Sequence, residues 1–261
     1  MIGFMLENGM DIARIDLSMG SHEDSLQLVE ALKKSLKIKT HHKCAVMVDL
    51  QGSQIRTLYV KDGQPAKVKK NQTLKVVSNP EVRVDDTMIS TNMVLPLRAG
   101  EKFFIDDGGL ELEVVEAVGD EIKARVLNNY ELKDLMAVNL TGEQLDQLAL
   151  EVMQRDELDI KEVVMKVSPD IISIPNVRKP EDVQKIREIL GQEGEIIKLF
   201  ARIESLEGIE NYEQIMQICD GIVVMRGALG CELADQEKLF VAQKWMIERA
   251  NVMGKTIVIG S

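Results

Sequence analysis

Short apolar runs alternate with segments of helical periodicity up to about residue 50 and again from about residue 139 onward. Six of these runs have the length of β-strands: 13–18, 45–50, 171–176, 196–204, 221–227 and 256–261. Between the first two, a helix is predicted after the cap residue Ser21, with an apolar stripe at Leu26, Val29, Leu32 and Leu36. Strands that alternate with helices are joined by right-handed crossovers into a parallel sheet. The sequence therefore predicts an α/β fold, either a doubly wound sheet or a (β/α) barrel.

The middle of the chain follows a different pattern. From residue 53 to residue 138 apolar and polar residues alternate with a period of two, and turn signals occur at Asp107-Gly108-Gly109 and at Gly119-Asp120. This pattern is typical of antiparallel hairpins. We expect an all-β domain over residues 53–138, inserted into an α/β domain made of residues 1–52 and 139–261.

Composition excludes several classes of protein. The formal charge of −11 argues against nucleic acid as a partner, because phosphate binding needs a basic face. No run is long and apolar enough to span a bilayer and the first residues do not resemble a signal peptide, so no membrane partner and a cytoplasmic location are expected. Three widely spaced cysteines predict neither disulfides nor zinc. The three histidines lie among polar residues and are predicted at the surface.

Charged residues gather where the predicted strands end. In parallel α/β folds the carboxyl ends of the strands carry the chemistry. The residues at these ends are Arg14, Asp16, Ser18, Asp49, Gln51, Gly52, Arg56, Arg202, Glu204, the stretch Arg226-Gly227-Ala228-Leu229-Gly230, and Ser261. Arginines that face carboxylates suit a phosphorylated anion, with a divalent metal on Glu204. The alternative is a set of structural ion pairs; the recurrence at successive strand ends favours the functional interpretation.

Seven segments resemble the pyruvate kinase family in order and spacing. They are GMDIARIDLSMGSHED, VMVDLQGSQIRT, FFIDDGGLELEV, AVNLTG, IKLFARIESLEGI, CDGIVVMRGALGCEL and AQKWMIERANVMGKTIVIGS. The resemblance implies an incomplete (β/α)8 TIM barrel, about strands 2–7, with the inserted β domain as the family's lid. It also implies that the first and eighth strands and the family's carboxyl-terminal allosteric domain are missing. Six strands would leave two open edges, so we expect a natural chain longer than 261 residues or partner chains that cover them.

The resemblance implies phosphoryl transfer between phosphoenolpyruvate and ADP, giving pyruvate and ATP in glycolysis, with Mg²⁺ or Mn²⁺ and K⁺. Arg14 and Arg56 match phosphate-side arginines, and Gly227 matches the glycine near the substrate carboxylate. Glu204 matches a ligand of the divalent metal. Ser18 and Asp49 match ligands of the monovalent ion, and Ser261 stands where the family has a threonine near the substrate.

Other family positions have changed. Arg202 stands at the catalytic lysine, and its planar fork cannot place a compact ammonium in the same spot. Ala228 replaces the second carboxylate of the divalent metal, while Asp16 and Leu50 replace an asparagine and a threonine of the potassium site. Met19 replaces a nucleotide-side histidine. We expect weakened binding of both ions.

Three hypotheses about function follow. The first is a catalytically impaired chain that acts as a structural or regulatory subunit, in a homo- or hetero-oligomer or a larger assembly. The second is an active pyruvate kinase with altered metal and K⁺ requirements, because Asp16 adds a negative charge beside Asp49. The third is a phosphoanion-binding module that keeps Arg14, Arg56 and the Gly227 loop.

Overall fold

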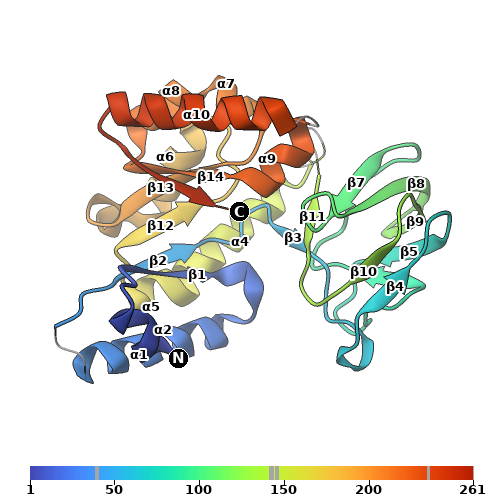
Figure 1. The fold of residues 1–261 in the computed structure, drawn as a ribbon, viewed down its shortest axis with the longest axis horizontal. Coiled ribbons are helices and arrows are strands. Elements are labelled where there is room, and N and C mark those ends of the chain that lie inside the picture. Colours follow the sequence, from blue (N-terminus) through green and yellow to red (C-terminus); the bar gives the residue numbers. More distant parts are fainter. Residues whose placement is uncertain (39–40, 141–143, 145–146, 234–235, 261) are drawn as a thin grey trace. The chain divides into compact units, whose positions relative to one another are not determined.

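The computed structural model describes residues 1–261 except 39–40, 141–143, 145–146, 234–235 and 261 (Figure 1). The chain forms two compact units. The α/β unit comprises Met1–Gly52, Leu150–Met225 and Phe240–Ser261, and the β unit comprises Ser53–Ala149 and Arg226–Leu239. The domain boundaries predicted at 52/53 and 138/139 stay a prediction.

Six parallel strands form the sheet of the α/β unit. Their bounds are β1 (Ile12–Asp16), β2 (Ala45–Asp49), β12 (Ile171–Ile174), β13 (Lys198–Ile203), β14 (Gly221–Met225) and β15 (Thr256–Gly260). The spatial order is the chain order, and every neighbouring pair is parallel (Figure 1). This topology is that of consecutive strands in a (β/α) barrel. It confirms the α/β class predicted from the six apolar runs and the partial barrel that the family resemblance implies.

Helices alternate with these strands. They are α1 (Ile2–Glu7), α2 (His22–Ile38), α4 (Ala149–Asp159), α5 (Met165–Val167), α6 (Pro180–Leu190), α7 (Leu206–Glu210), α8 (Tyr212–Ile218), α9 (Arg226–Leu233) and α10 (Gln236–Val252). Helices α2, α6, α8 and α10 are among those that the sequence predicted. The predicted cap of α2 is confirmed, since the backbone N–H of Asp24 donates to Ser21 Oγ at 3.1 Å and that of Ser21 donates back to the Asp24 carboxylate. Among the described residues, no helix combines the length and the apolar character needed to cross a membrane.

The interior of the α/β unit lies along its central strands. All residues of β12 are buried, as are four of the five in β2 and in β14, whereas β1 and β15 are more exposed. One buried cluster joins four neighbouring strands through Met47, Ile171, Phe200 and Val223. Strands that are buried on both faces give the continuous apolar runs from which the parallel sheet was predicted.

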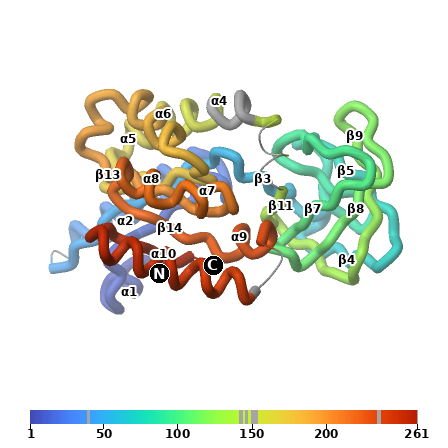
Figure 2. The backbone as a smooth tube through the Cα atoms, turned by 90° about the horizontal axis from the view of Figure 1, so that it is seen from above, coloured from blue at the N-terminus to red at the C-terminus, as the bar shows by residue number. Residues whose placement is uncertain are grey.

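The described residues of the β unit form nine strands, drawn in cyan to green in Figure 2. They are β3 (Ile55–Arg56), β4 (Ala66–Val68), β5 (Thr73–Val77), β6 (Met88–Ser90), β7 (Lys102–Ile105), β8 (Leu110–Val118), β9 (Glu121–Val126), β10 (Tyr130–Leu132) and β11 (Ala137–Asn139). The hairpins predicted at residues 107–109 and 119–120 are confirmed as β7–β8 and β8–β9. One expectation is wrong: β5 pairs with β6 in parallel, because the connection of residues 78–87 is too long for a tight turn.

Gly52 follows β2 at the end of the first segment of the α/β unit. Its φ of +48° lies in the left-handed region, and an added Cβ would sit 2.1 Å from Cγ of Pro175. Gly254 has a similar φ of +64° with nothing within 4 Å of such a Cβ. The two glycines share a positive φ but differ in the space around them.

We predict that Gly52→Ala lowers the free energy of unfolding by about 3 kcal/mol. Left-handed backbone costs an L-residue roughly 1–2 kcal/mol, and overlap with the rigid Pro175 ring adds about 1–3 kcal/mol. Gly254→Ala is the matched control and bears only the backbone cost. Urea unfolding of both variants measures the difference, and equal losses would show that the contact with Pro175 is unimportant.

Candidate functional site

The predicted site residues of the α/β unit meet at the carboxyl ends of β1, β2 and β13. Arg14 lies in β1, Asp49 ends β2, Arg202 lies near the end of β13 and Glu204 follows it. The register pairs Asp16 with Asp49 across β1 and β2. We call Arg14, Asp49, Arg202 and Glu204 the strand-end cluster.

Arg202 lies at the centre of the strand-end cluster. Its Nη1 donates to Asp49 Oδ2 at 3.0 Å, and its Nε lies 3.0 Å from Glu204 Oε1. The second contact is an ion pair whose angle does not make a hydrogen bond. Arg14 approaches the same Asp49 oxygen, with Nε donating to Oδ2 at 2.8 Å. One guanidinium therefore bridges two carboxylates, and a second guanidinium pairs with one of them.

Most of the strand-end cluster is buried, so each charged group is stabilised mainly by its oppositely charged neighbours. The side chains of Arg202 and Asp49 are 0% exposed and that of Glu204 is 11% exposed, whereas that of Arg14 is 39% exposed. Burial raises the pKa of Glu204; the charge of Arg202 opposes this rise and that of Asp49 adds to it. A buried charge is tolerated only with a close partner of opposite sign. The two arginines and two carboxylates, in their charged forms, sum to zero.

The monovalent-ion residues predicted near this cluster bond to each other. Asp16 Oδ1 accepts the backbone N–H of Ser18 at 2.9 Å and the Ser18 hydroxyl at 2.5 Å, and so caps the short helix Leu17–Met19. Leu50 is fully buried and Met19 is exposed. These contacts give Asp16 and Ser18 a local structural role.

The other predicted site residues belong to the β unit or fall outside the described residues. Arg56 belongs to the β unit, where its guanidinium donates to the carbonyl oxygen of Leu135 at 3.0 Å. Gly227 and Ala228 lie in α9, also in the β unit, and the Asp107 carboxylate packs directly on Gly227. Ser261 lies outside the described residues.

A second polar cluster of the α/β unit was not anticipated from the sequence. We call it the α4 network; its members are His22, Gln51, Arg155, Asp156 and Asp159. Asp159 is 0% exposed and accepts the backbone N–H of Gln51 at 2.7 Å and its side-chain amide at 2.8 Å. Arg155 donates to the Gln51 side chain at 2.9 Å and to the carbonyl oxygen of Gly52 at 3.0 Å. The α4 network thus holds α4 against the segment that follows β2.

The predicted surface position of His22 is wrong. Its side chain is only 23% exposed, and its Nε2 lies 2.7 Å from Asp159 Oδ1. The two residues are 137 positions apart in the chain. No local pattern could have paired them; the only signal was that Gln51 and Gly52 follow a predicted strand.

Asp156 contributes a buried carboxyl group to the α4 network. Burial, with a further contribution from the charge of Asp159, raises its pKa from 3.8 to about 7. Arg155 and the backbone N–H of Gly52 oppose this rise. In the window between these pKa values the folded protein binds a proton that the unfolded chain has released, so stability falls as pH rises through it.

We predict that Asp156→Asn is increasingly more stable than the wild type between about pH 4 and about pH 7, and that the difference then levels off. In the wild type, ionisation of Asp156 lowers the free energy of unfolding by up to about 1.4 kcal/mol per pH unit, and the neutral amide of Asn removes this loss. Urea unfolding at several pH values measures the free energy of unfolding of each variant. Glu157→Gln, at an exposed position of the same helix, should track the wild type. A constant difference between Asp156→Asn and the wild type would contradict the proposed titration.

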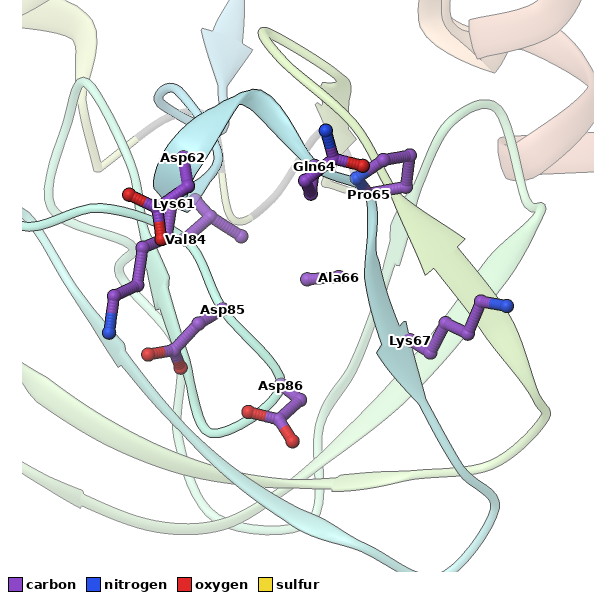
Figure 3. Close-up of a pocket in the computed structure, with 9 residues that line it drawn as sticks. All are labelled: Lys61, Asp62, Gln64, Pro65, Ala66, Lys67, Val84, Asp85 and Asp86. Carbon is purple, nitrogen blue, oxygen red and sulfur yellow. The ribbon is translucent and has the colours of Figure 1, made fainter.

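The β unit also has a shallow pocket of about 360 Å³. Figure 3 shows its lining, in which Lys61 and Lys67 lie on opposite sides and Asp62, Asp85 and Asp86 add carboxylates. The Asp85 carboxylate accepts the N–H groups of Thr87 and Met88 and so stabilises its own turn. None of the predicted site residues lines this pocket.

Comparisons with known proteins agree with the fold. The family model of the pyruvate kinase barrel domain matches residues 1–261. The cytosolic isozyme of pyruvate kinase from Solanum tuberosum is 33% identical over 99% of this chain and 51% of its own length, and pyruvate kinase from Staphylococcus aureus strain MRSA252 is 34% identical over 99% and 44%.

A solved pyruvate kinase structure has a similar fold. That of Cryptosporidium parvum pyruvate kinase in complex with ADP superposes with a TM-score of 0.86 at 32% identity, covering 99% of this chain and 52% of that one. The chain thus spans about half the length of the curated relatives it matches. By sequence over its whole length and by fold, it belongs to the pyruvate kinase family.

Proposed function

We propose that this chain is a catalytically impaired member of the pyruvate kinase family that acts in the cytoplasm as a structural or regulatory subunit of an oligomer or a larger assembly. One observation carries the proposal. The guanidinium of Arg202, at the position of the family's catalytic lysine, is fully buried and engaged by Asp49 and Glu204. A cation whose charge is already balanced inside the protein is poorly placed to stabilise a phosphoryl group in transfer.

The chemistry of the family reaction explains why this matters. Phosphoryl transfer depends almost entirely on positioning and on cations aimed at the developing negative charge. Loss of one preorganised group of this kind costs roughly 2.7–4 kcal/mol of transition-state stabilisation. This chain has changed two such positions, since Arg202 replaces a lysine and Ala228 replaces a carboxylate. The combined loss is enough to reduce turnover by several orders of magnitude.

The residues present do not fit the divalent and monovalent ions that the family resemblance implies. Ala228 has no oxygen ligand in its side chain, and Asp49 and Glu204 face guanidinium groups. Asp16 and Ser18 bond to each other, and Leu50 is apolar. Among the described residues, no group of three or more His, Cys, Asp or Glu side chains is placed to hold a metal. No step of the proposed function depends on a bound ion.

A specific observation also favours retained binding of a phosphoanion. The Arg14 side chain is 39% exposed at the end of β1, so its guanidinium can reach a ligand. The Cryptosporidium parvum relative was solved in complex with ADP. Phosphoenolpyruvate or ADP and ATP are therefore the ligands to test. Binding of this kind without turnover is compatible with a regulatory subunit.

We predict that the purified chain forms pyruvate from phosphoenolpyruvate and ADP, with Mg²⁺ or Mn²⁺ and K⁺ present, at least about 100-fold more slowly than the Solanum tuberosum isozyme assayed in parallel. The double variant Arg202→Lys/Ala228→Asp should recover part of the rate, because it restores a compact ammonium and a carboxylate. Arg202→Lys/Ala228→Asn is the control, matched in size but lacking the charge.

The competing hypotheses give different outcomes. Turnover by the wild type within the usual range of about 1–10³ s⁻¹ would overturn the proposal and support an active enzyme with altered ion requirements. Thermal stabilisation of the wild type by phosphoenolpyruvate or ADP, without turnover, would support the phosphoanion-binding role.

A further inference from the structure

We propose that Arg202 is a built-in counter-ion: its guanidinium takes the place of a bound metal ion between Asp49 and Glu204, and its removal exposes a latent oxygen-ligand site for a divalent cation. This role of Arg202 affects how the stability of the fold depends on cations, and it is independent of whether the chain is catalytically impaired.

The sheet explains why a single arginine can fill this role. Asp49 ends β2 and Glu204 follows β13, with β12 lying between these two strands. Strands are about 4.8 Å apart, so the two carboxylates start from backbones separated by roughly twice that distance. The long forked side chain of Arg202 contacts both at 3.0 Å. An arginine can direct donors to two carboxylates at once, which a compact ammonium does less well.

The oxygen atoms around Arg202 point to a latent site. Asp49 Oδ1, Glu204 Oε1 and Ser173 Oγ are buried and accept no hydrogen bond from any described residue. Ser173 lies in β12 in register with Asp49, so both side chains belong to the same face of the sheet. Two carboxylates and a hydroxyl are the hard oxygen ligands that divalent cations such as Mg²⁺ and Mn²⁺ bind.

The charge balance of the strand-end cluster determines whether the guanidinium of Arg202 or a metal ion lies between Asp49 and Glu204. With Arg202 present, the strand-end cluster is balanced, and an added divalent ion would meet a buried guanidinium of the same sign. Without Arg202, Asp49 keeps Arg14 at 2.8 Å, but Glu204 loses the guanidinium with which it forms an ion pair. A mobile cation can then supply the missing charge.

The test compares the wild type with Arg202→Met, which keeps an unbranched apolar stem and removes the charged guanidinium. Thermal unfolding is followed in EDTA with tetramethylammonium, and then with Mn²⁺, Mg²⁺ or K⁺. We expect the wild-type midpoint to be the same in all four, and that of Arg202→Met to fall by on the order of 10 °C in EDTA. Mn²⁺ at 100 times its dissociation constant should raise the folding constant of this variant about 100-fold.

Two further variants make the result specific. Arg202→Met/Glu204→Gln removes a ligand of the latent site and should lose Mn²⁺ binding, measured by electron paramagnetic resonance. Arg249→Met breaks an exposed ion pair with Glu213 and should neither gain Mn²⁺ binding nor become cation-dependent.

Two outcomes would overturn the proposal. One is Mn²⁺ binding to the wild type that Glu204→Gln abolishes, which would place a metal ion beside Arg202. The other is a folded Arg202→Met variant that binds no Mn²⁺. If that variant does not fold at all, the wild-type titration still decides through the first outcome.

Discussion

The guanidinium of Arg202 lies between the carboxylates of Asp49, which ends β2, and Glu204, which follows β13; Arg202 and Asp49 are fully buried, and Glu204 is 11% exposed. In such surroundings each charge needs its partner, because an unpaired buried ion costs several kcal/mol. Asp49 is shared with Arg14, so the pairing extends from β1 to the end of β13. Ion pairs among Arg14, Asp49 and Arg202 therefore stabilise the carboxyl end of the sheet.

The chain matches the pyruvate kinase barrel domain in sequence and in fold. The charges at its strand ends form a set of their own, because Arg202 lies between Asp49 and Glu204 and Arg14 pairs with Asp49. Under the proposed function, Arg202 and Ala228 take the place of a lysine and a carboxylate of the family. A site can thus keep its place at the strand ends while its groups serve the stability of the chain, because fold and function are set by different residues.

The α4 network also stabilises the end of β2, by bonding helix α4 to the residues that follow this strand. Asp159 gathers donors from His22 and Gln51, and Arg155 reaches the carbonyl oxygen of Gly52. These contacts fix the segment that leaves β2, where Gly52 packs against Pro175. Both polar clusters of the α/β unit therefore act on the end of the same strand.

The sequence by itself determined the elements and much of the site's location. Strand and helix periods are local, so the six parallel strands, the α2 cap and two hairpins could be predicted, as could the gathering of Arg14, Asp49, Arg202 and Glu204. Tertiary structure alone decided which charges pair, the burial of His22 and the parallel pairing of β5 with β6. Arg202 and Asp49 are 153 positions apart, and no local pattern carries a contact over that distance.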